Sequence, residues 1–329
     1  MGVSTGKTPK VSVCIPSYNH AQFLEECIYS VLNQTLQDLE LIICDDASSD
    51  NTLTVIDKIR DQRLKLYQNE SNIGPSATAI RANNLSQGEY IHILASDDVM
   101  LPDNLKLKVA VLDKYPHAGL VYSDALLINA DGKSTGTYWT SEGYRPVRGK
   151  LNIQLITCVG NIIPAISVMM RRTVIDKVGY FDPSIKYAQD LDLWLRIAGE
   201  FDLEYISQPL VCWRQHEMNF HGRRDPQEYL DRVEVIKRIT AKYPNIISTK
   251  LKKILLANCT AQAGLQIAQQ DPKRARRFFA DALAICYYHI PALIFYINSY
   301  LRLKSLWNFK IYKKLLLLIL NWRRTDCSS

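Results

Sequence analysis

The sequence lacks several features that would place it in well-known classes of protein. Its eight cysteines include no C-x-x-C pair, so we expect free thiols in a reducing compartment and neither a zinc knot nor a disulfide framework. The first ten residues contain no hydrophobic signal region, which favours a cytoplasmic protein. No G-x-G-x-x-G or G-x-x-x-x-G-K-S/T motif follows a predicted strand, so a dinucleotide fingerprint and a P-loop are excluded.

The net charge of +7 is unevenly distributed over the 329 residues. Residues 271–329 contain 11 Lys or Arg and 3 Asp, a surplus of +8, so residues 1–270 are close to neutral. A nucleic-acid-binding protein would carry basic residues over its globular part. We therefore expect no nucleic acid as a partner.

Strands and helices alternate over the first hundred residues. Short apolar runs predict strands at 11–16, 39–46, 63–68 and 89–96, and apolar residues at helical spacing predict helices between them. This alternation predicts an α/β fold with a largely parallel sheet and helices on both faces. Ligands of such sheets bind beyond the carboxyl ends of the strands. Three of these ends carry polar segments, namely PSYN, DDASSD and SDD.

Asp97 and Asp98 follow the fourth predicted strand, and adjacent carboxylates repel each other unless a partner compensates them. Mg²⁺ or Mn²⁺ takes one or two protein carboxylates and completes its shell with water and phosphate oxygens. Such an ion would stabilise a departing diphosphate as a Lewis acid. The alternative is that one Asp caps the helix starting near Pro102 and the other is solvated.

Longer motifs extend this pattern in a fixed order. They are VSVCIPSYNHAQFLEECIYSVLNQT, ELIICDDASSDNT, NIGPSA, GEYIHILASDDVMLPDNL, HAGLVYSDALLINADGK and YFDPSIKYAQDLDLWLRIAGEFDLEYISQPLVCWRQH. Over residues 10–220 the chain resembles the family 2 glycosyltransferases of GT-A fold, which move a sugar from a nucleotide diphosphate donor to a hydroxyl. The resemblance implies a mixed, Rossmann-like GT-A domain at 8–224, with a nucleotide-sugar-binding half at 8–100 and an acceptor-binding half at 101–224. It also implies an inverting, metal-assisted direct displacement, with a UDP-sugar as the expected donor.

Carried over by position, the resemblance places Pro16, Tyr18 and Asn19 beside the nucleotide. It implies that Asp46 accepts hydrogen bonds from the base or ribose and that Asp45 supports it, since charge-assisted bonds suit this role. The alternative is that Asp45 and Asp46 form an ordinary turn at the start of a helix.

The same resemblance assigns Asn72 and Gly74 to the next nucleotide-sugar-binding loop. Asn72 could equally be a plain turn residue, and Gly74 is expected to supply a special backbone angle or a close approach. Arg81 stands later than the arginine of many relatives and is not assigned to phosphate. The metal triplet reads SDD, so Asp98 is the expected principal ligand, and Asp97 is a supporting carboxylate on the nucleotide sugar.

In the acceptor half, AQDLDLWLRIAG resembles the family segment EDxxLWxR. We expect Asp190 to be the general base that takes the proton of the acceptor hydroxyl. The alternative is that Asp190 only stabilises the helix N-terminus. Gln189 replaces the usual Glu, and Trp194 is expected in the core rather than as a sugar-stacking platform.

CWRQH resembles the family ending R-x-H, in which both side chains close over the diphosphate or the metal. This implies that Arg214 binds the nucleotide sugar and that His216 is a metal ligand, although His216 could be an ordinary polar residue. The other histidines, including His20, His92 and His117, show no metal-ligand spacing.

Residues 225–329 read as a basic helical extension that the resemblance does not cover. Residues 282–301 lack Lys, Arg, Asp and Glu, but their proline, histidine, asparagine and tyrosines make them a poor membrane span. The segment KSLWNFKIYKKLLLLILNWRR is typical of helices at anionic membrane interfaces. We therefore expect peripheral contact with the inner face of the cell membrane. The alternatives are a packed cap or an oligomer contact.

The expected acceptor is a saccharide or a lipid-linked saccharide. One rival is a non-catalytic nucleotide-sugar-binding or membrane-adaptor protein on the same fold. The other is a sugar nucleotidyltransferase, which needs a glycine- and arginine-rich phosphate loop after the first strand, where this chain has PSYNHAQF.

Overall fold

The computed structural model describes residues 8–151, 161–217 and 225–301, which group into two compact units. We call residues 8–184 and 192–217 the sheet unit, and residues 185–191 and 225–301 the helical unit. The division passes through one helix, α8 (Gln189–Glu200), between Leu191 and Asp192. The domain limits suggested by the sequence, 8–224 and 225–329, stay a prediction.

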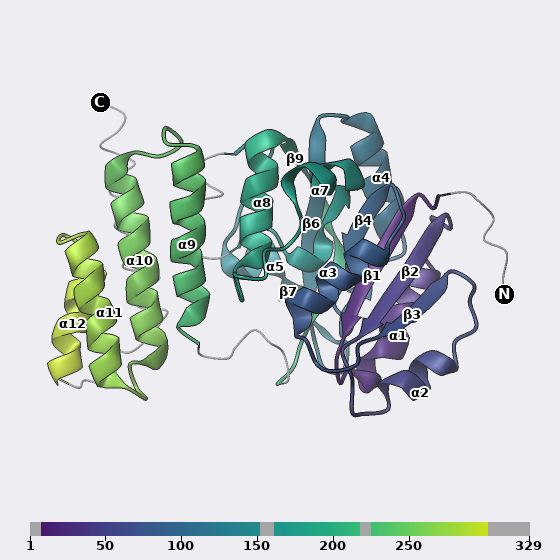
Figure 1. Ribbon diagram of the computed structural model, residues 1–329, viewed down its shortest axis with the longest axis horizontal. Helices are drawn as coiled ribbons and strands as arrows, with labels where there is room; N and C mark the ends of the chain where they lie inside the picture. Colours follow the sequence, from purple (N-terminus) through teal and green to yellow (C-terminus); the bar gives the residue numbers. More distant parts are fainter. Residues whose placement is uncertain (1–7, 152–160, 218–224, 302–329) are drawn as a thin grey trace. The chain divides into compact units, whose positions relative to one another are not determined.

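The sheet unit is built on a mixed sheet with the strand order β3-β2-β1-β4-β8-β6-β9-β5, and β7 pairs with β6 (Figure 1). Its strands are β1 (Val11–Ser17), β2 (Leu39–Asp45), β3 (Leu64–Gln68), β4 (Tyr90–Ile93), β5 (Val99–Met100), β6 (Ala118–Asn129), β7 (Ser134–Thr137), β8 (Met169–Arg171) and β9 (Asp202–Gln215). β1 to β4 pair in parallel, as predicted, whereas β8 is antiparallel to both β4 and β6. The order reverses direction between β1 and β4, which is the topological switch point where open α/β sheets bind ligands.

Helices cover both faces of this sheet, as the alternation predicted. α1 (Ala21–Leu32) and α4 (Asn104–Lys114) share a core with Val11, Val13 and Ile15 of β1. α3 (Pro75–Leu85) contacts β1 and β2, and the intervening β1 residues Ser12 and Cys14 face the other side because strand side chains alternate. The remaining short elements are α2 (Thr52–Asp57), α5 (Tyr138–Glu142), the 3₁₀ helix η1 (Ala165–Ser167) and α7 (Arg172–Val178).

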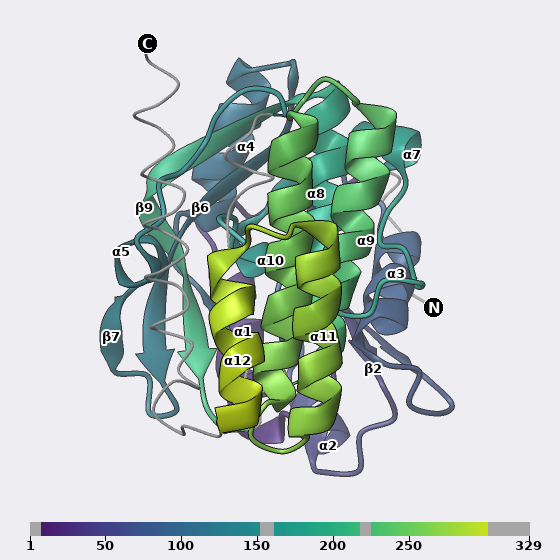
Figure 2. The ribbon, with the colours of Figure 1, turned by 90° about the vertical axis from the view of Figure 1, so that its left-hand side faces the viewer.

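The helical unit contains α9 (Gln227–Lys242), α10 (Thr249–Ile267), α11 (Pro272–Ile285) and α12 (Ile290–Leu301), each in contact with the next (Figure 2). Gly264 lets α10 approach α11 closely, because a Cβ there would lie 3.0 Å from both Ala275 O and Phe278 Cβ. The side chains of Ser248 and Asp271 cap α10 and α11 by accepting hydrogen bonds from backbone N–H groups. The helices expected after residue 225 are therefore present up to residue 301.

The six cysteines within the described ranges are free and buried, in line with the expected reduced thiols. Among the described residues, every helix is too short or too polar to cross a bilayer. The tail segment from Lys304 to Arg324 lies outside the described residues.

Candidate functional site

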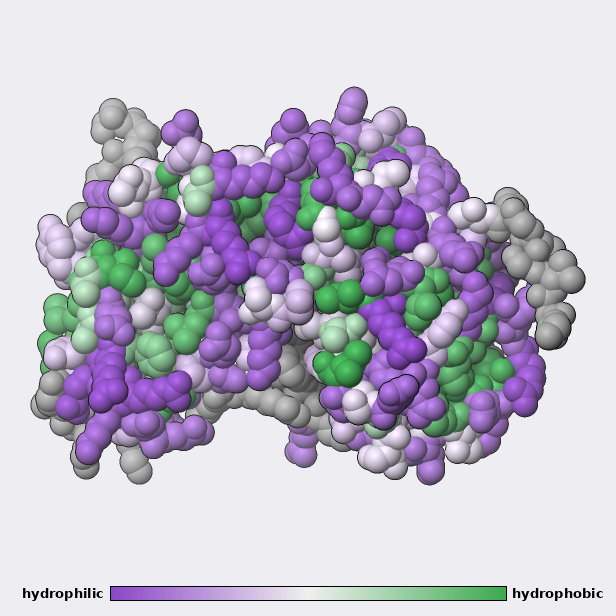
Figure 3. Space-filling model, viewed as in Figure 1, coloured by the Kyte–Doolittle hydropathy of each residue, from purple (hydrophilic) through white to green (hydrophobic). Residues whose placement is uncertain are grey.

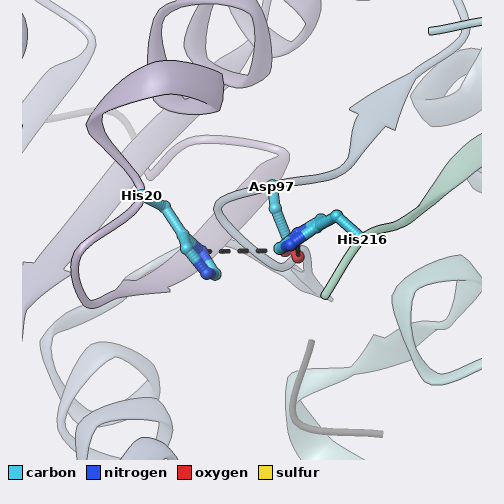
Figure 4. A group of neighbouring side chains, drawn as sticks. All are labelled: His20, Asp97 and His216. Carbon is cyan, nitrogen blue, oxygen red and sulfur yellow. Dashed lines mark hydrogen bonds and ion pairs between the residues drawn. The ribbon is translucent and has the colours of Figure 1, made fainter. Parts of the chain in front are cut away.

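Three polar side chains from different strand ends meet in the sheet unit (Figure 4). His20 follows β1, Asp97 follows β4, and His216 follows β9. His216 Nε2 lies 2.9 Å from Asp97 Oδ2, and His20 Nδ1 lies 3.9 Å from Asp97 Oδ1. One ligand atom of each residue lies within 4.8 Å of those of the other two. We call these three residues the His–Asp–His cluster.

The cluster is largely shielded from water, since the side chains of Asp97 and His216 are only 7% and 6% exposed. Burial lowers the pKa of His20, although the charge of Asp97 acts in the opposite direction. His20 is therefore a neutral imidazole at neutral pH, the form that binds metal ions. Its Nδ1 also lies 2.8 Å from Ser96 Oγ.

This donor set fits a divalent cation. Carboxylate oxygens suit Mg²⁺ and Mn²⁺ alike, whereas imidazole nitrogens favour transition metals over Mg²⁺, which prefers oxygen ligands. The sequence analysis missed His20 because it considered spacing along the chain. The available signal was its place directly after PSYN, at the polar end of β1.

Asp98 differs from Asp97 in what its carboxylate contacts. Its Oδ1 accepts a hydrogen bond from Arg214 N at 2.8 Å, and the residue is 2% exposed. Burial raises the pKa of Asp98 well above its usual value, and the charge of Asp97 adds to this. The resemblance implied that Asp98 is the principal metal ligand, which stays a prediction; in the structure Asp97 is the carboxylate that lies with the two histidines. Neither carboxylate caps α4, whose N-cap residue is Asp103.

Arg214 binds the backbone of two segments near the cluster, at Asp97 and at Ala130. Its Nε donates to Asp97 O at 2.9 Å and its Nη1 to Ala130 O at 2.9 Å, while Nη2 pairs with the Glu26 carboxylate. The guanidinium also lies over the ring of Phe23, 4.9 Å from its centroid. Arg214 is thus buried and holds the backbone next to the cluster, an arrangement that does not favour the diphosphate contact expected from the sequence.

Asp46, directly after β2, also holds the backbone of another segment through its carboxylate. Its Oδ1 accepts hydrogen bonds from Asn69 Nδ2 at 2.7 Å and Ile73 N at 2.9 Å, and its Oδ2 accepts from Gly74 N at 2.9 Å. Gly74 has φ +89°, so it supplies the special backbone angle expected of it. Arg81 contacts Asn69 Oδ1, which places it in the same network.

Asp45 leaves one carboxylate oxygen without a partner. Its Oδ2 accepts from Ser48 N at 3.0 Å, as in the turn that the sequence left open, but its buried Oδ1 has no hydrogen-bond partner in the described part of the chain. The same holds for Oγ of Ser17, the residue paired with Asp45 across the β1–β2 register. Buried polar atoms normally have partners, so these two are candidate ligand contacts.

The backbone just after Ser17 and just after Asp45 adopts an uncommon conformation. Asn19 and Ala47 have φ values of +53° and +58°, and Asn19 Oδ1 accepts from Ser49 N at 2.8 Å. Such conformations persist only where surrounding contacts enforce them, and they cluster at functional sites. Tyr18 is 45% exposed beside this turn. Roles for Pro16 in β1, Tyr18, Asn19 and the exposed Asn72 in donor binding stay predictions.

Asp190 lies in the first turn of α8, within the helical unit, and its Oδ1 accepts a hydrogen bond from Leu191 N at 2.7 Å. Asp192, two residues further along α8, is paired with Arg196 Nε at 2.7 Å. Trp194 is fully buried, which confirms the expected core position.

The sequence is similar to those of known glycosyltransferases. The chain matches glycosyl transferase family 2 over residues 12–179. An uncharacterized glycosyltransferase of Rickettsia typhi is 30% identical over 211 residues, which cover 64% of this chain and 65% of the relative, slightly less than two thirds of its length. The UDP-Glc:alpha-D-GlcNAc-diphosphoundecaprenol beta-1,3-glucosyltransferase WfgD of Escherichia coli is 29% identical over 202 residues, which cover 61% of this chain and 75% of WfgD.

Two solved structures share the fold at low sequence identity. S. aureus TarS in complex with UDP-GlcNAc superposes with a TM-score of 0.64 at 19% identity, covering 88% of this chain and 89% of TarS. The mannosyltransferase PcManGT from Pyrobaculum calidifontis, in complex with GDP-Man and Mn²⁺, superposes with a TM-score of 0.54 at 16% identity, covering 89% and 85%.

The mixed sheet, with polar residues gathered at the carboxyl ends of its strands, has the GT-A fold of these two structures. The chain belongs to glycosyl transferase family 2. The two rivals, a non-catalytic adaptor and a sugar nucleotidyltransferase, gain no support from these matches.

Proposed function

We propose that this glycosyltransferase moves a sugar from a UDP-sugar to a hydroxyl of a saccharide carried on a lipid diphosphate, with inversion at the anomeric carbon. The observation that carries the proposal is the His–Asp–His cluster, which stands at the carboxyl ends of β1, β4 and β9 in a chain of this family. The lipid-linked acceptor is supported by the relationship to WfgD, whose name describes such an acceptor.

The residues of this chain would divide the reaction as follows. Asp97, His216 and His20 would hold a divalent cation, which when bound supplies a Lewis acid for the departing diphosphate. Asp190 would accept the proton of the acceptor hydroxyl while its oxygen bonds to the anomeric carbon. The bond from that carbon to the diphosphate oxygen breaks, and its electron pair leaves with the nucleotide.

Asp45 would read the base. Its buried Oδ1 has no partner among the described residues, and a carboxylate oxygen is the natural acceptor for the uracil N3–H. Ser17 Oγ, on the neighbouring strand end, would add a second polar contact. Guanine also carries an N–H at its Watson–Crick edge. If the enzyme uses a GDP-sugar as its donor, Asp45 would bind guanine and not uracil.

Contact with the membrane would bring the enzyme to a lipid-linked acceptor. Ile290, Leu293 and Ile297 follow one face of α12 and are 53%, 44% and 49% exposed. Apolar side chains are visible on the face of the helical unit that Figure 3 draws. The basic, leucine-rich segment that follows in the sequence has the composition of interfacial helices and would add to membrane affinity.

A donor screen tests the proposal most directly. Purified enzyme is incubated with UDP-, dTDP- and GDP-sugars and a lipid diphosphate-linked saccharide, with Mn²⁺ or with a chelator, and the product is identified by mass spectrometry and by the configuration of the new bond. We expect turnover with a UDP-sugar only in the presence of the metal, and a loss of kcat of about 10²-fold in Asp190→Asn with donor affinity kept. Full turnover in excess chelator, or an unchanged kcat in Asp190→Asn, would contradict the mechanism.

A further inference from the structure

The segment that carries Asp190 is held by α9. Residues 185–191 precede and begin α8, yet they group with the helical unit. Asp231 Oδ2 on α9 accepts a hydrogen bond from Tyr187 N at 2.7 Å, and the Tyr187 hydroxyl donates to Asp225 Oδ2 at 2.6 Å. Tyr187, three residues before Asp190, is therefore held by two carboxylates of the helical extension, Asp231 at its backbone N–H and Asp225 at its hydroxyl.

The Asp231 carboxylate is a costly way to make this contact. Asp231 is only 5% exposed, and its other oxygen accepts from Gln227 Nε2 at 2.7 Å. Burying a carboxylate is unfavourable unless hydrogen bonds compensate, and apolar replacements of buried charges are often neutral or stabilising. Packing alone would not require a polar side chain here, whereas orienting a loop N–H requires a hydrogen-bond acceptor.

The next residue of α9 is electrostatically linked to Asp190 itself. Arg232 is buried, which disfavours its charge, but Glu228, Cys259, Tyr229 and Asp190 together raise its pKa. α9 thus contributes two consecutive residues to the surroundings of this segment.

We propose that Asp231 is a positioning residue for Asp190, through its hydrogen bond to the Tyr187 backbone, and that the helical extension is a working part of the acceptor site. This inference rests on the proposed function, in which Asp190 is the general base. A base must lie within hydrogen-bond reach of the proton that it removes, and a displacement of about 1 Å can lower the rate about 10²-fold. Loss of Asp231 should therefore slow the chemical step and leave donor binding intact.

The test begins with Asp231→Ala in the full-length enzyme. We expect kcat to fall about 10-fold to 100-fold, with unchanged affinities for the UDP-sugar and for Mn²⁺. Asp231→Asn should recover most of the rate, because its amide oxygen can accept from Tyr187 N while the Gln227 amide turns to accept from the new NH₂ group. Ser248→Ala is the matched control: it removes the N-cap of α10, destabilises the helical unit by about 1 kcal/mol and should keep kcat.

A double-mutant cycle separates positioning from general damage. If Asp231 acts through Asp190, the variant carrying both Asp231→Ala and Asp190→Asn should be no slower than Asp190→Asn alone. Multiplying losses, or an unchanged kcat in folded Asp231→Ala, would overturn the inference. If Asp231→Ala does not fold, Tyr187→Phe removes only the hydroxyl bond to Asp225 and enters the same cycle, with an expected loss of about 3-fold to 10-fold.

Failure of the proposed function would look different. It would appear as no turnover in the unmodified enzyme, or as an unchanged kcat in Asp190→Asn, before any substitution of Asp231 is considered.

Discussion

The turn after β2 and the turn after β4 each carry two consecutive aspartates, and in both turns the two carboxylates have different partners. The second residue of each pair holds the backbone of another segment: Asp46 binds the N–H groups of Ile73 and Gly74, and Asp98 binds that of Arg214. The first residue, Asp45 or Asp97, presents an oxygen to an unpartnered position or to two histidines. In each pair one carboxylate holds a neighbouring segment, and we expect the other to face the ligand.

This division explains why a double aspartate is useful at the carboxyl end of a strand. Asp45 is the last residue of β2, and consecutive side chains of an extended chain point in opposite directions, so Asp45 and Asp46 can face different segments. Asp97 and Asp98 lie in a turn, where their different contacts set the two directions. The carboxylate that holds the adjoining segment also fixes the turn that carries its neighbour. The family resemblance assigns the main ligand role to the second residue of each pair, whereas the contacts in the structure favour the first.

Substituting the second pair should have the largest effect. Asp97→Ala is expected to remove most Mn²⁺ affinity and to lower turnover at least about 10²-fold, with little change in melting temperature. Asp98→Ala should instead lose about 1–3 kcal/mol of stability, because the Arg214 N–H is left without its acceptor, and Asp98→Asn should restore it. Calorimetric Mn²⁺ titration and thermal melts of the three variants measure this. If Asp98→Ala loses the metal while Asp97→Ala retains it, the assignment from the sequence is right.

The first pair should show the same contrast with a smaller effect on function. Asp45→Asn replaces a charge-assisted acceptor by a neutral one and should weaken UDP binding about 10-fold, with the fold retained. Asp46→Asn should disturb the loop at Ile73 and Gly74 and lower the melting temperature, since an amide cannot accept all three of its hydrogen bonds. UDP titrations and melts of both variants provide the comparison. Equal losses of UDP affinity without any loss of stability would show that the pair is not divided.

Much of the fold was predictable from the sequence because its signals are local. The alternation of strands and helices, the special angle at Gly74 and the core position of Trp194 each depend on nearby residues. The family motifs then indicated which strand ends form the site.

The rest depends on contacts between distant parts of the chain. His20 and His216 meet because β4 is the strand beside β1 and because the chain returns through β9, an order that residue spacing does not contain. The burial of Arg214 depends on Glu26 and Ala130. Which aspartate of a pair faces the site is set by such long-range contacts, so the motif alone could not decide it.

The relative affinities for Mn²⁺ and Mg²⁺ test whether both histidines bind the metal together with Asp97. His20→Ala should weaken Mn²⁺ binding about 10-fold but Mg²⁺ binding much less, because the lost ligand is an imidazole nitrogen. Titration of each metal alone, without donor, gives a readout independent of turnover. His117→Ala, at an exposed position away from the cluster, is the control. An equal loss for both metals, or none for either, would remove His20 from the ligand set.

Lys108 belongs to neither aspartate pair, and its substitution should change stability without affecting catalysis. Lys108 of α4 is fully buried with its Nζ 3.3 Å from His92 Nε2, and burial holds its pKa well below 10.5. Between the folded-state pKa and 10.5 the unfolded chain binds one more proton, so the stability of the unmodified protein should rise with pH across that window. Lys108→Met removes this dependence and should increase the free energy of unfolding at about pH 7 by about 1 kcal/mol or more, with a gain that shrinks toward about pH 10. Denaturant unfolding of both proteins at the two pH values measures the difference. A constant difference, or a less stable Lys108→Met at neutral pH, would mean that Lys108, like Asp46 and Asp98, stabilises the fold through its polar contacts.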